Sequence, residues 1–284
     1  MADLTYPASI VLGIVEGLTE FLPVSSTGHL TVAEELLGLQ VDAPEVTAYT
    51  AIIQLGAIAA TFLYFAGDIL RLFKAWVGGL RNPVRRADPD YGLAWAVLVG
   101  SLPVALVGFA LKDLIEGGLR SLWVVAAALI LWSAVMVVAE RRHVVLERQG
   151  VTRGEHDVRM RDGLVIGLVQ CFSLIPGVSR SGATISAGLV RGIDRVTATR
   201  LSFFMAIPAL TAAGLYEGAK TDLSGLGLGP LVLGIVIAFV VAYASIAWLL
   251  RFVAGHTLLS FVWYRVAAGL VLILALGAGW VSAT

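Results

Sequence analysis

Long apolar stretches without charged side chains restrict the fold of this chain more than any other feature. About 20 apolar residues in a helix cross roughly 30 Å of hydrocarbon, so each such stretch is a candidate membrane crossing. With 58% hydrophobic and 14% charged residues, the composition excludes a soluble globular domain. Six crossings are predicted, at about residues 46–67, 91–111, 121–139, 197–217, 223–250 and 260–282.

Two further apolar stretches cannot be straight helices. Residues 8–39 contain Glu16 and Glu20, and residues 163–191 are interrupted by Pro176 and the glycine that follows it. Each stretch is the length of two half-helices joined by a turn, which is typical of a re-entrant hairpin. Because backbone at that depth has no water to bond, we expect both turns to line a cavity.

Charge is balanced overall but unevenly placed. Twenty basic residues offset twenty acidic ones, so nucleic acid is not an expected partner. Most Lys and Arg residues fall in the loops after the first and third crossings, which predicts that these loops are cytoplasmic and both termini outside. No Lys or Arg precedes Arg71, so a cleaved signal peptide is not expected. The single cysteine, Cys171, carries no information on redox compartment.

The two interrupted stretches are related to each other. Two short motifs recur at a constant offset of 154 residues: Gly13-Ile-Val-Glu16 with Gly167-Leu-Val-Gln170, and Val24-Ser-Ser-Thr-Gly28 with Val178-Ser-Arg-Ser-Gly182. Repeat 1 would cover about residues 8–140 and repeat 2 about residues 162–284, each with one hairpin and three crossings. Since three is odd, the copies have opposite orientations. The predicted fold is therefore an all-α integral membrane protein with an inverted-topology repeat and hairpins meeting near the midplane.

The second hairpin turn has the composition of an anion site. Free backbone N–H groups and hydroxyls converge where the turn enters a helix, and Arg180 adds a guanidinium suited to phosphate oxygens. An alternative is that Ser179 only caps the helix and Arg180 reaches the membrane surface. The candidate phosphate-binding residues from the two turns are Arg180, Ser179, Ser181, Thr184, Ser25 and Thr27.

The first turn offers groups for catalysis. Ser26 and His29 could serve as nucleophile and base. Glu16 and Glu20, four residues apart, share one face of an otherwise apolar half-helix. Two carboxylates in such a setting should be partly protonated or hold a cation, so they could act as acid or base, or bind Mg²⁺ or Ca²⁺. The alternative is that both carboxylates face water from a shallow interfacial helix.

These residues carry a resemblance that covers essentially the whole chain. The chain resembles the undecaprenyl-diphosphate phosphatase family, also called bacitracin-resistance proteins. Two segments resemble the family's glutamate-rich and serine–histidine motifs and its Pro-Gly-x-Ser-Arg-Ser-Gly motif: Glu16-Gly-Leu-Thr-Glu20-Phe-Leu-Pro-Val-Ser-Ser-Thr-Gly-His29 and Pro176-Gly-Val-Ser-Arg-Ser-Gly-Ala-Thr184.

The resemblance implies an enzyme of the bacterial cytoplasmic (inner) membrane. It would remove the terminal phosphate from a C55 polyprenyl diphosphate, recycling the lipid carrier for peptidoglycan and giving bacitracin resistance, with its active site opening to the periplasmic side. By position, the resemblance places the family's glutamates, active-site serine, histidine and arginine on Glu16, Glu20, Ser26, His29 and Arg180. Ser179 and Thr184 match supporting polar positions.

The sequence leaves several alternatives open. Ser26 is the first choice of nucleophile, with His29 orienting or deprotonating it, but direct attack by His29 is the alternative. Arg265 could reach either the membrane surface or the cavity. Inverted repeats with broken helices are also typical of secondary transporters, so a carrier or a lipid-phosphate flippase is the rival function. The expected partners are the lipid substrate and membrane lipids, and a homodimer is allowed.

Overall fold

The chain is built of helices throughout the part that the structure describes. The structure is a computed structural model, and it describes residues 4–41, 43–111, 114–115, 119, 121–220 and 227–282. The α-helices are α1 (Tyr6–Thr19), α2 (Ser26–Leu36), α3 (Pro44–Tyr64), α4 (Ala66–Arg81), α5 (Pro89–Ala110), α7 (Leu122–Arg148), α8 (Met160–Gln170), α9 (Arg180–Val190), α10 (Arg195–Lys220), α11 (Leu228–Gly255) and α12 (Leu259–Gly277). Three short 3₁₀ helices are η1 (Pro83–Ala87), η2 (Glu155–Asp157) and η3 (Cys171–Leu174).

Five of these helices are long and apolar enough to cross a membrane. They are α3, α5, α7, α11 and α12, and they coincide with five of the six predicted crossings. The sixth, at about 197–217, falls on α10, which has the length but carries Arg195 and Arg200 in its first two turns. The all-α membrane fold is confirmed, while the crossing by α10 stays a prediction.

One helix was not predicted. The segment from residue 68 to 86 was expected to be a loop, but most of it forms α4, which packs against α5. Leu70, Phe73 and Leu80 are exposed at helical spacing on α4, beside exposed basic residues such as Lys74. The charges that marked this segment as a loop belong to an amphipathic helix, in which apolar and basic side chains share the surface.

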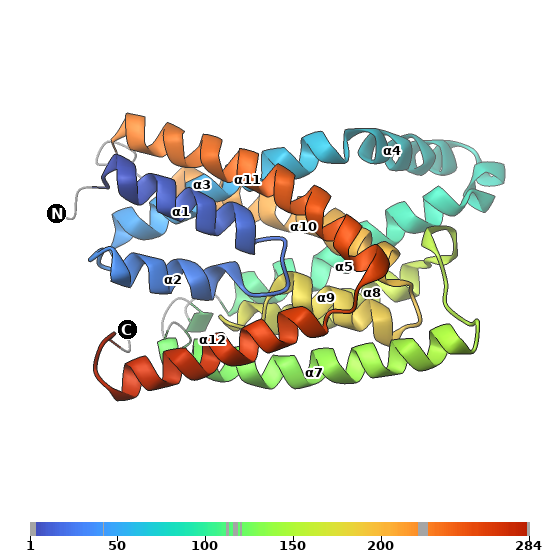
Figure 1. The fold of residues 1–284 in the computed structure, drawn as a ribbon. Coiled ribbons are helices and arrows are strands. Elements are labelled where there is room, and N and C mark those ends of the chain that lie inside the picture. The colour runs from blue at the N-terminus through green and yellow to red at the C-terminus, as the bar shows by residue number, and fades with distance from the viewer. Residues whose placement is uncertain are drawn as a thin grey trace.

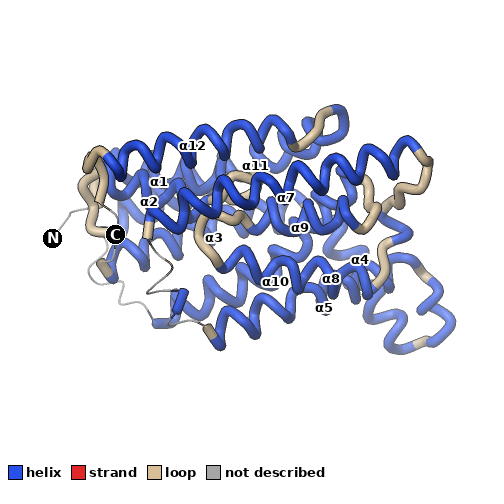
Figure 2. Tube along the Cα trace, turned by 90° about the horizontal axis from the view of Figure 1, so that it is seen from below, coloured by secondary structure: helices blue, strands red, loops and turns tan. Residues whose placement is uncertain are grey.

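The two hairpins enter the bundle from opposite ends (Figure 1). Helices α1 and α2 begin and end near the chain termini, and their turn lies in the middle of the molecule. Helices α8 and α9 approach from the other end, and Figure 2 shows the same arrangement from below. The paired elements of the two halves therefore have opposite directions, as the repeat predicts.

Glycines let the first helix of each hairpin pack closely on a long helix. A Cβ on Gly17 of α1 would lie 2.7 Å from the carbonyl oxygen of Ala238 on α11. A Cβ on Gly167 of α8 would lie 2.1 Å from the carbonyl oxygen of Gly100 on α5. Both contacts belong to pairs of glycines four residues apart, which in membranes allow close helix packing. The hairpins are thus fixed in equivalent ways in both halves.

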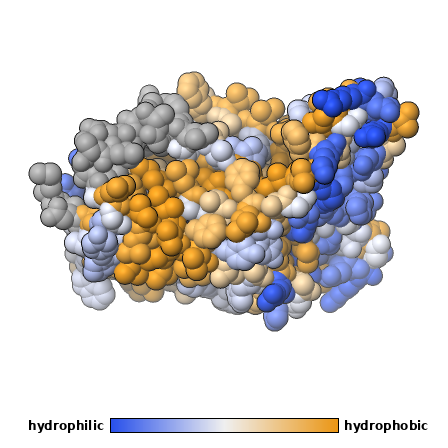
Figure 3. Space-filling view, turned by 90° about the horizontal axis from the view of Figure 1, so that it is seen from above, coloured by the Kyte–Doolittle hydropathy of each residue, from blue (hydrophilic) through white to orange (hydrophobic). Residues whose placement is uncertain are grey.

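Charged side chains gather at the end opposite the termini. Figure 3 shows apolar side chains across the middle of one face and hydrophilic ones at that end. There, Arg71 pairs with Asp68, Asp90 and Glu155. Burial alone would lower the pKa of Arg71, but the hydrogen bonds that it donates to these carboxylates outweigh burial and raise the pKa. Arg200, at the start of α10, pairs with Asp68 and Glu155 in the same network. The predicted cytoplasmic loops therefore lie together at one end.

Candidate active site

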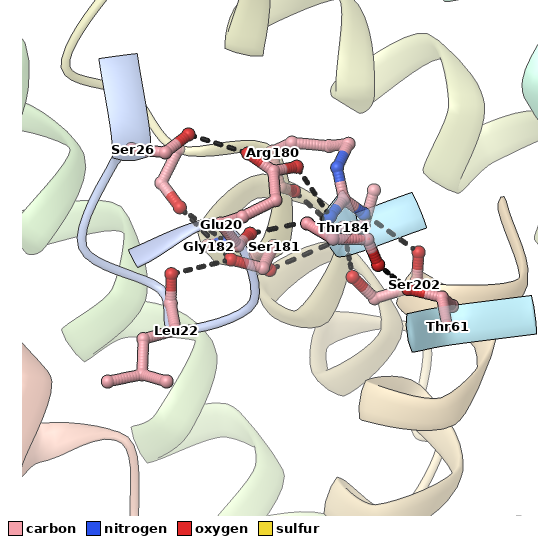
Figure 4. A network of polar contacts seen from close by, with 11 residues as sticks. Glu20, Leu22, Ser26, Thr61, Arg180, Ser181, Gly182, Thr184 and Ser202 are labelled. Atoms are coloured by element: carbon pink, nitrogen blue, oxygen red, sulfur yellow. Dashed lines mark hydrogen bonds and ion pairs between the residues drawn. The ribbon is translucent and has the colours of Figure 1, made fainter. Parts of the chain in front are cut away.

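The turns of the two hairpins touch each other. The Ser181 hydroxyl donates to the carbonyl oxygen of Leu22 at 2.9 Å (Figure 4). The backbone N–H of Gly177 donates to the Ser25 hydroxyl at 3.1 Å. These contacts join positions more than 150 residues apart in the chain. The two repeats therefore meet at one place in the middle of the bundle.

Both turns use the same unusual backbone conformation. Ser25 has φ 78° and Ser179 has φ 77°, and no other residue except glycine has a positive φ among the described residues. The two serines are separated by the offset of the repeat. A non-glycine residue in this region is strained by about 1–3 kcal/mol, and such strain is concentrated at functional sites. Ser179 also caps α9, because its hydroxyl accepts from the backbone N–H of Gly182 at 3.2 Å.

Three side chains form a continuous contact across the two turns. The Ser26 hydroxyl donates to Glu20 Oε2 at 2.6 Å, and Arg180 Nη2 donates to Glu20 Oε1 at 3.2 Å (Figure 4). Arg180 Nη1 also donates to the carbonyl oxygen of Ser202, whereas its buried Nε has no partner. Glu20 is placed to accept the Ser26 proton, and Arg180 retains a donor for a further anion.

A cavity of about 500 Å³ adjoins this contact. Its polar wall comes from both turns, and its apolar wall comes largely from α5 and α10, including Val104, Phe109 and Leu210. A cavity with one polar and one apolar wall suits an amphiphile whose charged head lies beside Arg180. The polar residues that line it are Glu20, Ser25, Ser26, Thr27, Gln54, Gln170, Ser173, Ser179 and Arg180.

A second cavity, of about 260 Å³, is also lined by Ser26. Glu16 lines it together with threonines of α2 and α3, and Ser26 and Thr27 line both cavities. Glu16 is 1% exposed, and its Oε1 has no hydrogen-bond partner. The interpretation of Glu16 and Glu20 as residues of a shallow interfacial helix is wrong, because both carboxylates are buried.

His29 makes its hydrogen bonds to groups other than the Ser26 hydroxyl. Its Nδ1 is 2.7 Å from the carbonyl oxygen of Ser25, and its Nε2 is 2.6 Å from the hydroxyl of Tyr264, whose ring stacks on the imidazole. The Ser26 hydroxyl is directed to Glu20 instead. The structure therefore does not support the predicted pairing of His29 with Ser26, since both ring nitrogens are engaged elsewhere.

The predicted phosphate-binding residues divide into two groups. Arg180, Ser179, Ser25 and Thr27 line the larger cavity. The Ser181 hydroxyl donates to the Leu22 carbonyl oxygen. The Thr184 hydroxyl donates to the Arg180 carbonyl oxygen at 2.9 Å or to the Ser202 hydroxyl at 2.7 Å. Neither Ser181 nor Thr184 lines either of these two cavities. Their hydroxyls therefore stabilise the turn and do not face the space where a ligand would bind.

Arg265 is a site residue whose role the sequence left open. It is 0% exposed and donates to the carbonyl oxygens of Pro23 at 3.1 Å and Gly177 at 2.9 Å, one from each turn. Its Nε donates to Ser133 on α7. Arg265 thus joins both turns to α7 and α12. A charge inside the sequence of an apolar helix is the signal that marks such a residue.

Of the two buried glutamates, only Glu16 has a free carboxylate oxygen for a divalent cation. The described residues contain no cluster of three or more His, Cys, Asp or Glu side chains of the kind that encloses a metal. Mg²⁺, however, is commonly held by one or two carboxylates together with substrate phosphates and water. The unpartnered Oε1 of Glu16 is available for this, whereas both oxygens of Glu20 are engaged by Ser26 and Arg180.

Fold and site together define a class of protein: a multi-pass membrane protein with a polar site where two opposed helical hairpins meet. Residues 9–271 match the family model described as bacitracin resistance protein BacA, and the chain belongs to this family.

Three relatives of known name align with nearly the whole chain. It is 55% identical to undecaprenyl-diphosphatase 3 of Frankia casuarinae, over 97% of this chain and 98% of the relative. It is 54% identical to the undecaprenyl-diphosphatase of Cutibacterium acnes, over 93% and 95%. The undecaprenyl-diphosphatase of Acidothermus cellulolyticus is 51% identical, over 97% and 98%.

Proposed function

We propose that this chain hydrolyses undecaprenyl diphosphate to undecaprenyl phosphate and inorganic phosphate. One observation carries the proposal: Ser26, Glu20 and Arg180 contact one another beside a cavity with one polar and one apolar wall. The names of the relatives support the same substrate. Release of the monophosphate lipid would return the carrier to cell-wall synthesis, and the family description names bacitracin resistance as the outcome.

Ser26 is the proposed nucleophile and Glu20 its base. As the Ser26 oxygen attacks the terminal phosphorus, its proton passes to Glu20 Oε2, and the bond from that phosphorus to the bridging oxygen breaks. Undecaprenyl phosphate leaves with the bridging oxygen. Water then attacks phosphoserine, and Glu20 returns its proton to the Ser26 oxygen as the bond from that oxygen to phosphorus breaks. Inorganic phosphate leaves with both protons of the water, so the hydroxyl and the carboxylate are both regenerated. Direct attack by His29 is less favoured, because both of its ring nitrogens already have partners.

Arg180 and the turns supply the electrostatic stabilisation. The guanidinium would neutralise phosphate oxygens, and the N-termini of α2 and α9 direct backbone N–H groups toward the same region. Charge neutralisation and positioning account for most of the rate in phosphoryl transfer. Ser25, Thr27 and Ser179 add hydroxyl groups to the polar wall.

A divalent cation is part of the proposal. Glu16 would hold Mg²⁺ or Ca²⁺ through its unpartnered carboxylate oxygen, and Glu20, whose oxygens already bond Ser26 and Arg180, is the second candidate ligand. When bound, the cation would reduce the negative charge of the diphosphate. The residue roles derived above do not depend on which of the two ions is present.

The proposed location is the bacterial cytoplasmic membrane, with the charged end facing the cytoplasm because Lys and Arg concentrate there. The site would open to the periplasmic side through the smaller cavity, whose walls include Thr31 and Thr47 from helices near the terminal end. The homodimer stays a prediction and enters no step of the reaction.

Phosphate release from purified protein in detergent tests the function. Wild type should release inorganic phosphate from a polyprenyl diphosphate, and Ser26→Ala should not. A detergent micelle has no compartments, so release separates an enzyme from the rival carrier or flippase. Trapped phosphoenzyme should carry phosphate on Ser26. No release by wild type with any divalent cation would contradict the proposed function, and phosphate on His29 would contradict the assigned nucleophile.

A further inference from the structure

Gln170 is a buried amide without partners. It is the last residue of α8, is 0% exposed, and neither its Nε2 nor its Oε1 has a hydrogen bond. An unsatisfied buried polar atom costs about 1–3 kcal/mol, so native proteins seldom keep two on one side chain. Gln170 lines the larger cavity together with Ser26 and Arg180. Its polar atoms are therefore available to whatever occupies that cavity.

The repeat indicates what such an occupant is. Gln170 follows Glu16 by 154 residues, as Arg180 follows Ser26, so each residue has a counterpart in the other hairpin. At these two positions the first hairpin carries the Glu16 carboxylate and the Ser26 hydroxyl. At the equivalent positions, the second carries a neutral amide and a guanidinium. Both of the latter donate hydrogen bonds, and neither adds negative charge, which suits an anion.

We propose that Gln170 binds an oxygen of the phosphate that is transferred, donating from Nε2 beside Arg180. This rests on the proposed function, because a phosphate in the larger cavity is the ligand that function requires. The phosphate is favoured over the lipid tail, because apolar side chains of α5 and α10 already form the wall that suits the tail. Oε1 is left to accept from water in the same cavity.

The experiment compares Gln170→Met with wild type. Methionine has a similar length and removes both unsatisfied atoms, so the unfolding temperature should be unchanged or higher. In contrast, kcat/KM should fall about 10- to 100-fold, and the inhibition constant for inorganic phosphate should rise by a similar factor. Gln170→Glu should be more severe, because its carboxylate can repel phosphate. Gln149→Met, at the exposed residue that directly follows α7, is the matched control and should behave as wild type.

A binding measurement keeps this test independent of turnover. Inorganic phosphate should raise the unfolding temperature of wild type, and the rise should be smaller in Gln170→Met and intermediate in Gln170→Asn. An equal rise in wild type and Gln170→Met would overturn the inference, even if wild type is an active phosphatase. So would a large loss of stability in Gln170→Met with normal phosphate inhibition, because that pattern marks a packing role. Inactive wild type would contradict the proposed function itself.

Discussion

The two hairpin turns share a backbone but differ in chemistry. Ser25 and Ser179 have nearly the same positive φ, and each immediately precedes a helix that begins in the centre of the bundle. Yet the next residue is Ser26 in one turn and Arg180 in the other. The repeated backbone thus provides two opposed helix N-termini. The chemical difference between the turns comes from single side chains at equivalent positions. In the proposed function, the first turn attacks and the second binds the anion.

The turns also differ in how their hairpins are held at the outer ends. At the start of α8, Asp162 accepts two hydrogen bonds from Arg153 and further ones from Arg191 and the Arg159 backbone. Among the described residues, the start of α1 is capped by the Thr5 hydroxyl. In the proposed function, the anion-binding turn therefore belongs to the hairpin with the ionic anchor, and the reactive turn to the other.

Removing the cation from the second turn should have the largest effect. We expect Arg180→Ala to lower kcat/KM by about 10³- to 10⁵-fold, because an arginine that neutralises a transferring phosphoryl group contributes on this order. Arg180→Lys should keep only part of the wild-type kcat/KM, since an ammonium group lacks the planar guanidinium that can donate two parallel hydrogen bonds to a phosphate. Phosphate release from a polyprenyl diphosphate measures both. A loss below tenfold in Arg180→Ala would show that the second turn is not the anion site.

Neutralising the first turn should have a somewhat smaller effect. Glu20→Gln keeps the shape of the side chain but removes the base for Ser26, so kcat should fall about 10²- to 10⁴-fold with little change in KM. Phosphoserine formation should slow by the same factor in a rapid-quench measurement. If KM rises instead and the trapped intermediate forms normally, Glu20 binds substrate and does not accept the proton.

Much of this comparison was open to prediction from the sequence. The offset of 154 residues and the Pro, Ser and Gly turns predicted two opposed hairpins, and the structure places Glu20 and Arg180 in contact. Spacing along a helix shows which residues share a face, but not which distant helix they meet. His29 contacts Tyr264, 235 residues away, and Arg265 contacts both turns. A local sequence pattern cannot predict either contact.

The charged loop shows a similar limit of local pattern. The sequence predicted only that the basic loop after the third crossing faces the cytoplasm. In the structure, Arg153 holds Asp162, and its backbone pairs with Ile193 at the far end of the second hairpin. A backbone pairing between residues 40 positions apart follows no period in sequence, so only the fold reveals it.

The residue that joins the two turns should affect both stability and activity. Arg265→Met would leave the carbonyl oxygens of Pro23 and Gly177 buried without donors, each at a cost of about 1–3 kcal/mol. We expect an unfolding temperature roughly 5–10 °C lower. Turnover should fall about 10- to 100-fold, because the turns lose their register. Arg251→Met, at an exposed arginine on α11, is the control. Unchanged stability would show that Arg265 does not hold the turns together.

The ionic anchor of the second hairpin should have the smallest effect on activity and a distinct dependence on pH. Burial alone would raise the pKa of Asp162, but hydrogen bonds from Arg153, the Arg159 backbone and Arg191 outweigh it and lower the pKa to about 2. The folded state therefore binds this proton less readily than an unfolded chain, in which Asp has a pKa of about 3.9. The stabilisation is complete above that value and is lost as pH falls toward 2.

Asp162→Asn tests this anchor without touching either turn. The unfolding temperature of the variant should lie several degrees below wild type at pH 6, and the gap should close as pH falls from about 4 to 2. Turnover at neutral pH and 25 °C should change less than about twofold, because the turns keep their contacts. Glu147→Gln, which removes a half-exposed partner of Arg195, should show a much smaller gap. A gap that persists unchanged at pH 2 would mean that Asp162 holds the hairpin by shape and hydrogen bonding rather than by charge, and the two hairpins would then differ in their turns alone.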